Sequence, residues 1–568
     1  MIYAWDAHIM ERQISSAEVI TEQGRVDWAV VKVTAELSRL RESAGKSMGG
    51  PAAKIFDAQL MIAGDQEFLR KVKEEIKSTE RNAEFVYSSL VDQSTEPLRR
   101  SHDSYMRQML LDIEAVSVKI LGYLTGDNVH SETPFPPNTV IVARRLTPGE
   151  TLSYHERGAV GIVTAEGSST SHMALIARAL GVPAVVGAEK ILNQVRNGVR
   201  LIVDGGLGKV YIEPDDALWD KYKRQKRAGG REMIHKLAEL PEFPPRTKDK
   251  HPVDLEANIE LPGPRDKELS ERGVGVGLYR TEFIYLQSNH FPPEEEQFET
   301  YDAIAAQYAP RHVVMRTFDL GSDKYVEELQ PLHESNPALG WRGIRTSLDM
   351  PNIFRAQIRA ILRASTRKNV KILLPMVTDF EEIVRARKFI RSMMAELRKE
   401  KRTFDSRIEI GAMVEVPASA LAASTIVGVA DFLSIGTNDL VQYTMAVDRD
   451  NHRVAGLYNM FHPAPLRLIA MTLDAARRAG KPVTICGEMA GELRALPLLV
   501  GMGAKALSMN PTKIYNASRL VSAFSLREAK DLMKKVLAAQ TLKETEKLLN
   551  QFHARALARV KGVISERA

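Results

Sequence analysis

In the N-terminal part of this chain the apolar residues are spaced with the period of a helix. Between residues 23 and 126 apolar side chains recur every three or four positions, as at Val30, Val33, Leu37 and Leu40. This is the period of an amphipathic helix, so we expect residues 23–126 to form an all-helical domain. The residues alone do not tell a structural bundle from a surface that docks a partner protein.

Short β-rich runs separated by turns replace the helical pattern from Pro136 onward. Strands are predicted at 139–143, 161–164, 199–203 and 210–212, with one helix between Met173 and Leu180. Such a mixture predicts a compact α/β unit. We assign residues 1–22 and 127–213 to this unit, so that the helical domain is an insertion. Residues 214–250 follow as a charged helical linker with a proline-rich end.

Strand-like and helical segments alternate from residue 251 to residue 568. Eight apolar runs are predicted to be strands: Val253–Ile259, Gly273–Leu278, His312–Arg316, Lys371–Leu374, Ile408–Glu415, Phe432–Ile435, Val483–Ile485 and Ala506–Met509. Helical sequence such as Glu381 to Lys399 fills most of the gaps. Eight strand–helix units over about 300 residues are typical of a (β/α)8 TIM-type barrel. We therefore predict a multidomain α/β protein with a C-terminal barrel.

Composition narrows the class of protein that these elements build. The chain has 568 residues, of which 44% are hydrophobic and 26% charged, a balance typical of globular proteins. No apolar run reaches the roughly 18 residues of a membrane span, and the single cysteine, Cys486, fits a reducing cytoplasm. The net charge is +6, but Lys and Arg residues are interleaved with Asp and Glu along the chain. This pattern favours solvated helix faces over a nucleic-acid partner.

Five of the eight predicted strands end in side chains that bind ions or transfer protons. Arg280, Arg316, Glu415 and Cys486 stand at or just beyond four of these ends, and Gly436-Thr-Asn-Asp-Leu440 follows a fifth. The carboxyl ends of barrel strands form the functional face. Converging arginines bind carboxylate and phosphate groups, paired carboxylates favour Mg²⁺, and a thiol can move a proton. Each residue alone is more often an ion pair or a buried thiol, but together they favour a site.

A second candidate site lies at the start of the helix predicted near His172. In the segment Glu166-Gly-Ser-Ser-Thr-Ser-His172, Thr170 or Ser171 can cap this helix, and Gly181 can end it. A helix N-terminus favours negative charge, so a phosphoryl group on His172 would be stabilised there. A lone histidine in such a position is more often the neighbour of a structural cap.

As a set, the motifs resemble Enzyme I of the bacterial phosphoenolpyruvate-dependent sugar phosphotransferase system. They are Thr170-Ser-His172, Arg280-Thr-Glu, Arg316-Thr-Phe-Asp, Met413-Val-Glu-Val-Pro, Gly436-Thr-Asn-Asp-Leu and Cys486-Gly-Glu. The resemblance covers nearly the whole chain from about Phe56. It implies a swivelling phosphohistidine domain, an inserted helical domain that docks the carrier protein HPr, and a barrel that binds phosphoenolpyruvate and forms a homodimer.

The resemblance also implies a role for each matched residue. His172 would carry the phosphoryl group on Nε2, and Cys486 would protonate the enolate to give pyruvate. Glu415 and Asp439 would bind Mg²⁺. The implied substrate contacts are Arg280, Arg316, Arg342, Asn438, Asp439 and Arg449. The implied reaction moves the phosphoryl group from phosphoenolpyruvate to His172 and on to a histidine of HPr, the first step of sugar uptake, in the cytoplasm.

Several features depart from the family pattern. Met1 to Met10 lacks the usual first strand with a Ser-Pro-Gly-Ile-Ala-type segment, so either the α/β unit lacks an edge strand or the chain starts unusually. Ser168 and Ser322 stand where the family commonly has glycine. Two alternatives remain. One is a pyruvate phosphate dikinase or phosphoenolpyruvate synthase relative, for whose ATP-binding domain the chain has no room. The other is a regulatory protein that has lost catalysis.

Overall fold

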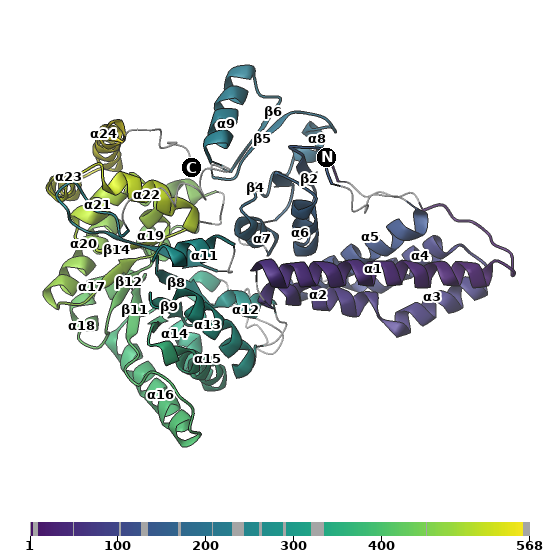
Figure 1. Ribbon diagram of the computed structural model, residues 1–568, viewed down its shortest axis with the longest axis horizontal. Coiled ribbons are helices and arrows are strands. Elements are labelled where there is room, and N and C mark those ends of the chain that lie inside the picture. Colours follow the sequence, from purple (N-terminus) through teal and green to yellow (C-terminus); the bar gives the residue numbers. More distant parts are fainter. Residues whose placement is uncertain are drawn as a thin grey trace. The chain divides into compact units, whose positions relative to one another are not determined.

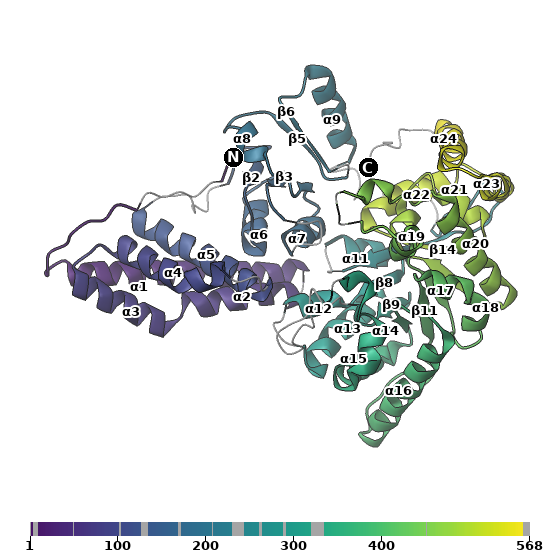
Figure 2. The ribbon, with the colours of Figure 1, turned by 180° about the vertical axis from the view of Figure 1, so that it is seen from behind.

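The computed structural model describes residues 2–3, 9–48, 50–100, 104–126, 134–167, 172–206, 208–229, 243–260, 264–287, 291–319, 334, 336–449, 451 and 453–560. The chain forms two compact units, which divide between Lys226 and Arg227. Figures 1 and 2 show the helices and strands of both units from opposite sides. Among the described residues, no helix combines the length and apolar composition needed to cross a bilayer.

Five helices form the N-terminal part of the first unit: α1 (Val19–Met48), α2 (Gly50–Ala63), α3 (Gln66–Thr79), α4 (Ala83–Arg99) and α5 (Ser104–Thr125). Helix α1 packs against α2, α3 and α5. Val33, Leu37 and Leu40 are completely buried in α1, so the predicted helical period is confirmed there. Glu22 of α1 accepts a 2.8 Å hydrogen bond from the N–H of Ala83, which gives the first turn of α4 an acceptor that it cannot find within its own helix.

The rest of the first unit holds a four-stranded sheet of order β1-β2-β3-β4. Its strands are β1 (Ile2–Tyr3), β2 (Val140–Ala143), β3 (Gly161–Thr164) and β4 (Ala184–Val185). The hypothesis that this unit lacks an edge strand is wrong, because β1 pairs in parallel with β2, with Ile2 opposite Val142. Pairing of this kind uses backbone N–H and C=O groups, so it does not depend on the family's usual first segment.

The same unit contains short helices and a hairpin around this sheet. The helices are α6 (Pro148–Glu156), α7 (His172–Leu180), α8 (Ile191–Gln194) and α9 (Asp216–Gly229), whose last three residues lie beyond the division between the units. Strand β5 (Leu201–Asp204) pairs antiparallel with β6 (Lys209–Ile212). The hydroxyl of Tyr222 in α9 donates to the Asp204 carboxylate at 2.7 Å, which fastens the helix to the hairpin.

The second unit contains a closed barrel of eight parallel strands. The strands are β7 (Asp254–Ile259), β8 (Val276–Arg280), β9 (Val313–Arg316), β10 (Val370–Leu374), β11 (Ile410–Val414), β12 (Leu433–Ile435), β13 (Val483–Ile485) and β14 (Ala506–Met509). Each corresponds to one predicted run, so the (β/α)8 fold is confirmed. The largest difference is at β8, which begins at Val276 rather than Gly273 and extends to Arg280.

Helices surround this barrel and connect its strands. The longer ones are α11 (Pro264–Glu271), α13 (Glu294–Tyr308), α15 (Pro351–Ala364), α16 (Phe380–Lys399), α19 (Thr437–Met445), α20 (Pro463–Arg478), α22 (Ile514–Val521), α23 (Leu526–Ala538) and α24 (Leu542–Arg559). The shorter ones are α12 (Glu282–Gln287), α14 (Ile344–Asp349), α17 (Pro417–Leu421), α18 (Ala423–Ile426) and α21 (Leu496–Gly501). Figures 1 and 2 show α16 extending beyond the other helices of this unit.

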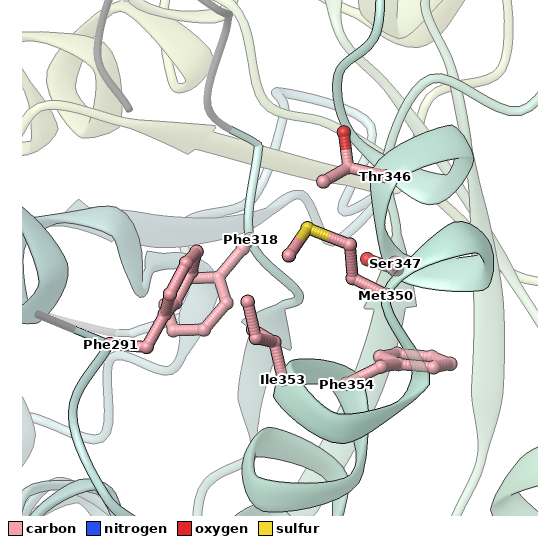
Figure 3. Close-up of a pocket in the computed structure, with 7 residues that line it drawn as sticks. All are labelled: Phe291, Phe318, Thr346, Ser347, Met350, Ile353 and Phe354. Atoms are coloured by element: carbon pink, nitrogen blue, oxygen red, sulfur yellow. The ribbon is translucent and has the colours of Figure 1, made fainter. Parts of the chain in front are cut away.

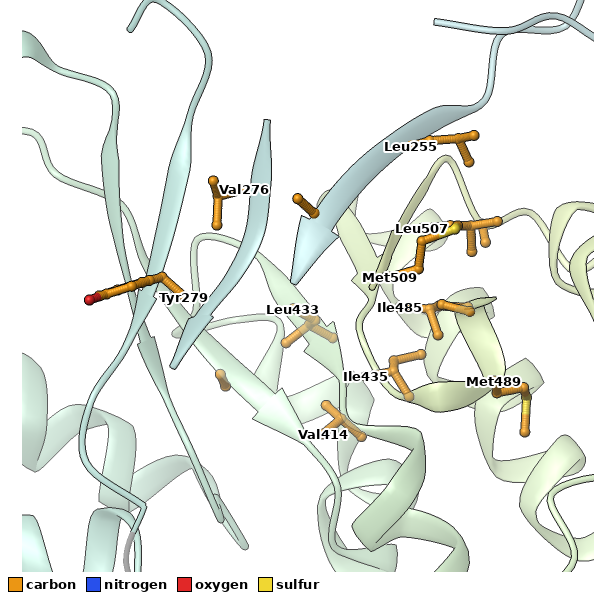
Figure 4. Close-up of a cluster of buried hydrophobic side chains, with 14 of the residues drawn as sticks. Leu255, Val276, Tyr279, Val414, Leu433, Ile435, Ile485, Met489, Leu507 and Met509 are labelled. Atoms are coloured by element: carbon orange, nitrogen blue, oxygen red, sulfur yellow. The ribbon is translucent and has the colours of Figure 1, made fainter. Parts of the chain in front are cut away.

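The side chains of the barrel strands alternate between two layers. One set, which includes Leu433, Ile435 and Ile485, packs against the surrounding helices (Figure 4). The other set forms a smaller separate cluster of Leu278, Val314, Leu373, Met413, Phe432 and Cys486. Because successive residues of a strand point to opposite faces, this second set lies inside the barrel. The large outer layer supplies most of the apolar burial, while the carboxyl ends of the strands remain available for polar groups.

The interior of the barrel is too closely packed at Gly411 to accept a side chain. A Cβ atom added there would lie 2.4 Å from Cε2 of Phe432. We therefore expect Gly411→Ala to lower the free energy of unfolding by about 1–3 kcal/mol, the usual cost of overpacking. Chemical denaturation measures this loss. Gly456→Ala, whose Cβ would meet nothing within 4 Å, is the control, and equal stability of the two variants would contradict the packing argument.

Candidate functional site

The predicted residues of the barrel stand at the carboxyl ends of its strands. Arg280 and Arg316 are the last residues of β8 and β9, and Glu415 and Cys486 directly follow β11 and β13. The remaining residues lie on connections that leave these ends. Asn438 and Asp439 are in the first turn of α19, Arg449 follows that helix, and Arg342 precedes α14. We refer to this set of strand ends and connections as the barrel mouth.

A continuous chain of ion pairs joins three arginines and two aspartates across the mouth. Nη1 of Arg316 lies 3.0 Å from Asp319, and Asp319 accepts hydrogen bonds from Nε and Nη2 of Arg342 at 2.9 and 2.7 Å. Nη2 of Arg342 also lies 3.0 Å from Asp439, and Nη1 of Arg449 lies 3.1 Å from the other oxygen of Asp439. The fork of Arg342 on Asp319 is the strong bidentate type, so this chain holds β9, α14 and α19 together.

Glu415 is the most deeply buried carboxylate of the mouth, with 1% of its surface exposed. Its Oε1 accepts a 2.7 Å hydrogen bond from the backbone N–H of Met376. Burial, with the negative charges of Asp319 and Asp439 close by, raises the pKa of Glu415 to about 8. Ionisation of Glu415 is disfavoured beside the two aspartates, and a cation bound among the three carboxylates would be favoured. Among the described residues, however, no three acidic, histidine or cysteine side chains form a ready metal site.

Cys486 is also buried, with 1% of its surface exposed. The hydroxyl of Ser434 donates to its Sγ at 3.1 Å, and the side-chain amide of Asn258 donates to its carbonyl at 2.8 Å. Burial raises the pKa of the Cys486 thiol to about 11, against the opposing effect of the Ser434 hydrogen bond. The thiol therefore keeps its proton at neutral pH, which is the form that a general acid needs.

The other predicted contacts are held by hydrogen bonds of their own. The side-chain oxygen of Asn438 accepts from the N–H of Glu488 at 2.8 Å, which links the ends of β12 and β13. Nη1 of Arg280 lies 2.5 Å from Oε1 of Glu260. Arg316 donates to Glu282 at 3.0 Å in addition to its bond with Asp319. The guanidinium groups are thus already oriented by carboxylates.

His172 is the first residue of α7, as the sequence predicts, and the helix ends before Gly181, whose φ of +70° is left-handed. Thr170, Ser171 and Ser168 lie outside the described residues, and so does Ser322. Directly before that segment, Glu166 forms an ion pair with Arg145, and its carbonyl accepts from the Thr164 hydroxyl at 2.8 Å. The backbone therefore places His172 where an anion is favoured.

Sequence reasoning missed two residues that organise the mouth. No role was predicted for Asp319, although its position three residues after Arg316 is a usable signal for an ion pair. Tyr443, whose hydroxyl accepts from Arg342 at 3.1 Å, is in α19 four residues after Asp439, a spacing that places both on one face of a helix. Neither residue type is diagnostic on its own.

A separate apolar cavity, shown in Figure 3, is lined in part by Phe318, which precedes Asp319 of the mouth. Its lining residues are Phe291, Phe318, Thr346, Ser347, Met350, Ile353 and Phe354. None of these side chains carries a charge, so the cavity offers nothing to hold an anionic substrate. Phe318 precedes Asp319 in the chain, and the N–H of Phe318 donates to Gln357 at 3.0 Å. The cavity wall therefore supports the backbone from which Asp319 projects.

Three segments of the sequence match families of known proteins. Residues 2–108 match the family described as PEP-utilising enzyme, N-terminal. Residues 135–208 match the PEP-utilising enzyme, mobile domain, and residues 235–526 match the PEP-utilising enzyme, PEP-binding domain. The chain therefore belongs to the class of phosphoenolpyruvate-utilising enzymes.

Curated relatives narrow the class to one family. The phosphoenolpyruvate-protein phosphotransferase of Bacillus subtilis is 38% identical over 95% of this chain and 94% of that protein. The proteins of the same name from Staphylococcus carnosus and Listeria monocytogenes are 36% and 37% identical, over 95% and 94% of this chain and 94% of each relative. This chain belongs to the family of phosphoenolpyruvate–protein phosphotransferases. It is an enzyme that transfers the phosphoryl group of phosphoenolpyruvate to protein, and neither the dikinase nor the non-catalytic alternative is favoured.

The raised pKa of Cys486 makes its reactivity a direct test of the buried site. At pH 8 a thiol of pKa about 11 is ionised more than about a hundredfold less than an ordinary thiol of pKa near 8.5. We expect iodoacetamide to alkylate the native protein at least that much more slowly than the unfolded protein. Because Cys486 is the sole cysteine, mass spectrometry reads this site alone. Equal rates in both states would contradict the burial of the thiol.

The raised pKa of Glu415 predicts a pH-dependent loss of stability without metal. Between pH 4.5 and 8 the folded protein keeps a proton on Glu415 that the unfolded chain has lost, so the stability due to this group falls as pH rises. We expect Glu415→Gln, measured in EDTA, to gain stability relative to wild type between pH 5.5 and 8. Thermal unfolding at both pH values measures the gain. An identical difference at the two pH values would contradict the charge argument.

Proposed function

We propose that the barrel mouth binds phosphoenolpyruvate through Arg280, Arg316, Arg342, Arg449 and Asn438. The observation that carries this proposal is the ion-pair chain through Asp319 and Asp439. It concentrates guanidinium groups at the end of a barrel where barrel enzymes place their substrates. Phosphate and carboxylate groups can replace aspartate oxygens as partners of these groups with the same bidentate geometry.

We further propose that Glu415 and Asp439 hold Mg²⁺ in this mouth. The fit rests on Glu415, whose buried position beside two other carboxylates raises its pKa, because a divalent cation would neutralise that crowding. Two protein carboxylates with substrate oxygens and water are the usual magnesium environment, so a site without three ready protein ligands is consistent with it. The bound ion would offset charge on the phosphate and on the enolate that remains after transfer.

Under this proposal His172 is the nucleophile. As the first residue of α7 it stands at a helix N-terminus, where the helix dipole favours the negative charge of a phosphoryl group. Its neutral imidazole attacks phosphorus in line, the P–O bond to the enolate breaks, and the phosphoryl group stays on Nε2. The Cys486 thiol then gives its proton to the enolate carbon, which yields pyruvate.

The proposed partners follow from the family. The acceptor is an HPr-type phosphocarrier protein, docked by the helical domain of residues 23–126, and the reaction is the first step of sugar uptake in the cytoplasm. The phosphohistidine domain, 1–22 with 127–213, would swivel on the linker 214–250 between this carrier and the barrel domain, 251–568. That barrel domain would also form a homodimer. The name shared by the relatives supports a protein acceptor.

Labelling with radioactive phosphoenolpyruvate tests the donor and the site together. With ³²P-phosphoenolpyruvate, Mg²⁺ and no ATP, we expect about one acid-labile label per chain, lost in His172→Ala and transferred to an added HPr-type carrier. His155→Ala, a change of another histidine in the same unit, should keep the label. Labelling of the His172→Ala protein at the wild-type level would overturn the assignment of His172, and a requirement for ATP would favour the dikinase alternative.

A further inference from the structure

Glu260 lies at the edge of the proposed substrate site and has no role in the proposed reaction. It directly follows β7, and Arg280 ends the neighbouring strand β8. In the register of this pair Ile259 lies opposite Tyr279, so Glu260 and Arg280 are the next residues along both strands. Their side chains meet with 2.5 Å between Oε1 and Nη1, which is a close charge-assisted contact.

Arg280 is much more accessible than the central arginines of the mouth. About a third of its side chain is exposed, against 10% for Arg316 and 13% for Arg342. Those two arginines each contact two carboxylates within the packed ion-pair network. The described structure gives Arg280 one ion pair, with Glu260, and the Nε of Arg280 is buried without an acceptor, as is the Nε of Arg316. Arg280 therefore has donor capacity left for an incoming anion.

The charge of Glu260 opposes that incoming anion in either of two geometries. If the substrate takes the place of Oε1 on Nη1, the ion pair with Glu260 must first break. If the substrate binds the remaining donors of Arg280, two anions lie side by side on one guanidinium group, and like charges at that separation repel. The side chain of Glu260 is a quarter exposed, so the carboxylate that a stronger ligand would displace is already partly solvated.

We propose that Glu260 is a built-in competitor for Arg280, which weakens the binding of anions at the mouth. The inference rests on the proposed binding of phosphoenolpyruvate by Arg280. A singly charged carboxylate gains little by exchanging with another carboxylate. A ligand that carries both phosphate and carboxylate can displace Glu260 because it draws on the other arginines as well. Glu260 thus sets the range of donor concentration over which the site fills.

Direct binding measurements test this proposal, because it predicts the direction in which the dissociation constant changes. In the His172→Ala protein, which cannot accept the phosphoryl group, calorimetric titration with phosphoenolpyruvate and Mg²⁺ reports affinity alone. We expect adding Glu260→Gln to lower the dissociation constant by roughly five- to fiftyfold, the scale of removing one nearby like charge. Pyruvate, which carries a single negative charge, should also bind more tightly. In the enzyme with His172, KM for phosphoenolpyruvate should fall and kcat should not rise.

Two controls separate the charge from the shape of the side chain. Glu271→Gln removes the same charge from an exposed position on α11 of the same unit and should leave the dissociation constant within about twofold. Glu260→Asp keeps the charge and should retain weak binding. Glu260→Ser removes both charge and length, and it replaces Glu260→Gln if that variant does not fold.

The opposite result identifies the rival role for Glu260. If Glu260 only orients the guanidinium group, removing it weakens binding and raises KM, and that outcome overturns the proposal, as does an unchanged affinity. Absence of phosphoenolpyruvate binding in the His172→Ala protein with Glu260 intact would instead overturn the proposed function, and the inference with it. The two failures are therefore distinguishable in one set of titrations.

Discussion

The requirement that buried arginines have partners governs the architecture of the barrel mouth. Arg316 and Arg342 are about nine-tenths buried, and a guanidinium group cannot shed its charge as a buried carboxylate or lysine can. Each must therefore be met by carboxylates, and Asp319 meets both. Since Asp319 and Arg342 lie on the connection between β9 and β10, and Asp439 lies on the connection between β12 and β13, pairing the charges also fixes how these two connections leave the barrel.

This pairing costs stability that the rest of the barrel must supply. Removing charges from water is expensive, and even well-formed buried ion pairs often stabilise a fold less than apolar packing would. Glu415 adds to that cost because Asp319 and Asp439 crowd it with like charge. The apolar layer between strands and helices, to which Leu433, Ile435 and Ile485 belong (Figure 4), is what offsets it. The apolar layer therefore holds the barrel closed, while the ends of the same strands carry the charged groups that destabilise the barrel.

The sequence predicted the barrel well because its strands are buried on both faces and so read as apolar runs. It also predicted which residues reach the mouth, since the residue that ends a parallel strand is located once the strand is located. Strands β1 and β4, each of two residues, were missed because so short a segment has no periodicity. The pairing of Arg280 with Glu260 was missed for another reason. It depends on how two strands register and where their side chains turn, and no motif records either.

The burial of Cys486 gives the proposed mechanism its order of events. A thiol of pKa about 11 is too weak an acid to protonate a phosphate ester or water to any useful extent. An enolate carbon is a far stronger base, and it exists only after the phosphoryl group has moved to His172. The proton is therefore kept until the first transfer is complete, without any movement of the thiol. Ser434, which donates to Sγ at 3.1 Å, holds the sulfur in place and stabilises the thiolate that forms when the proton leaves.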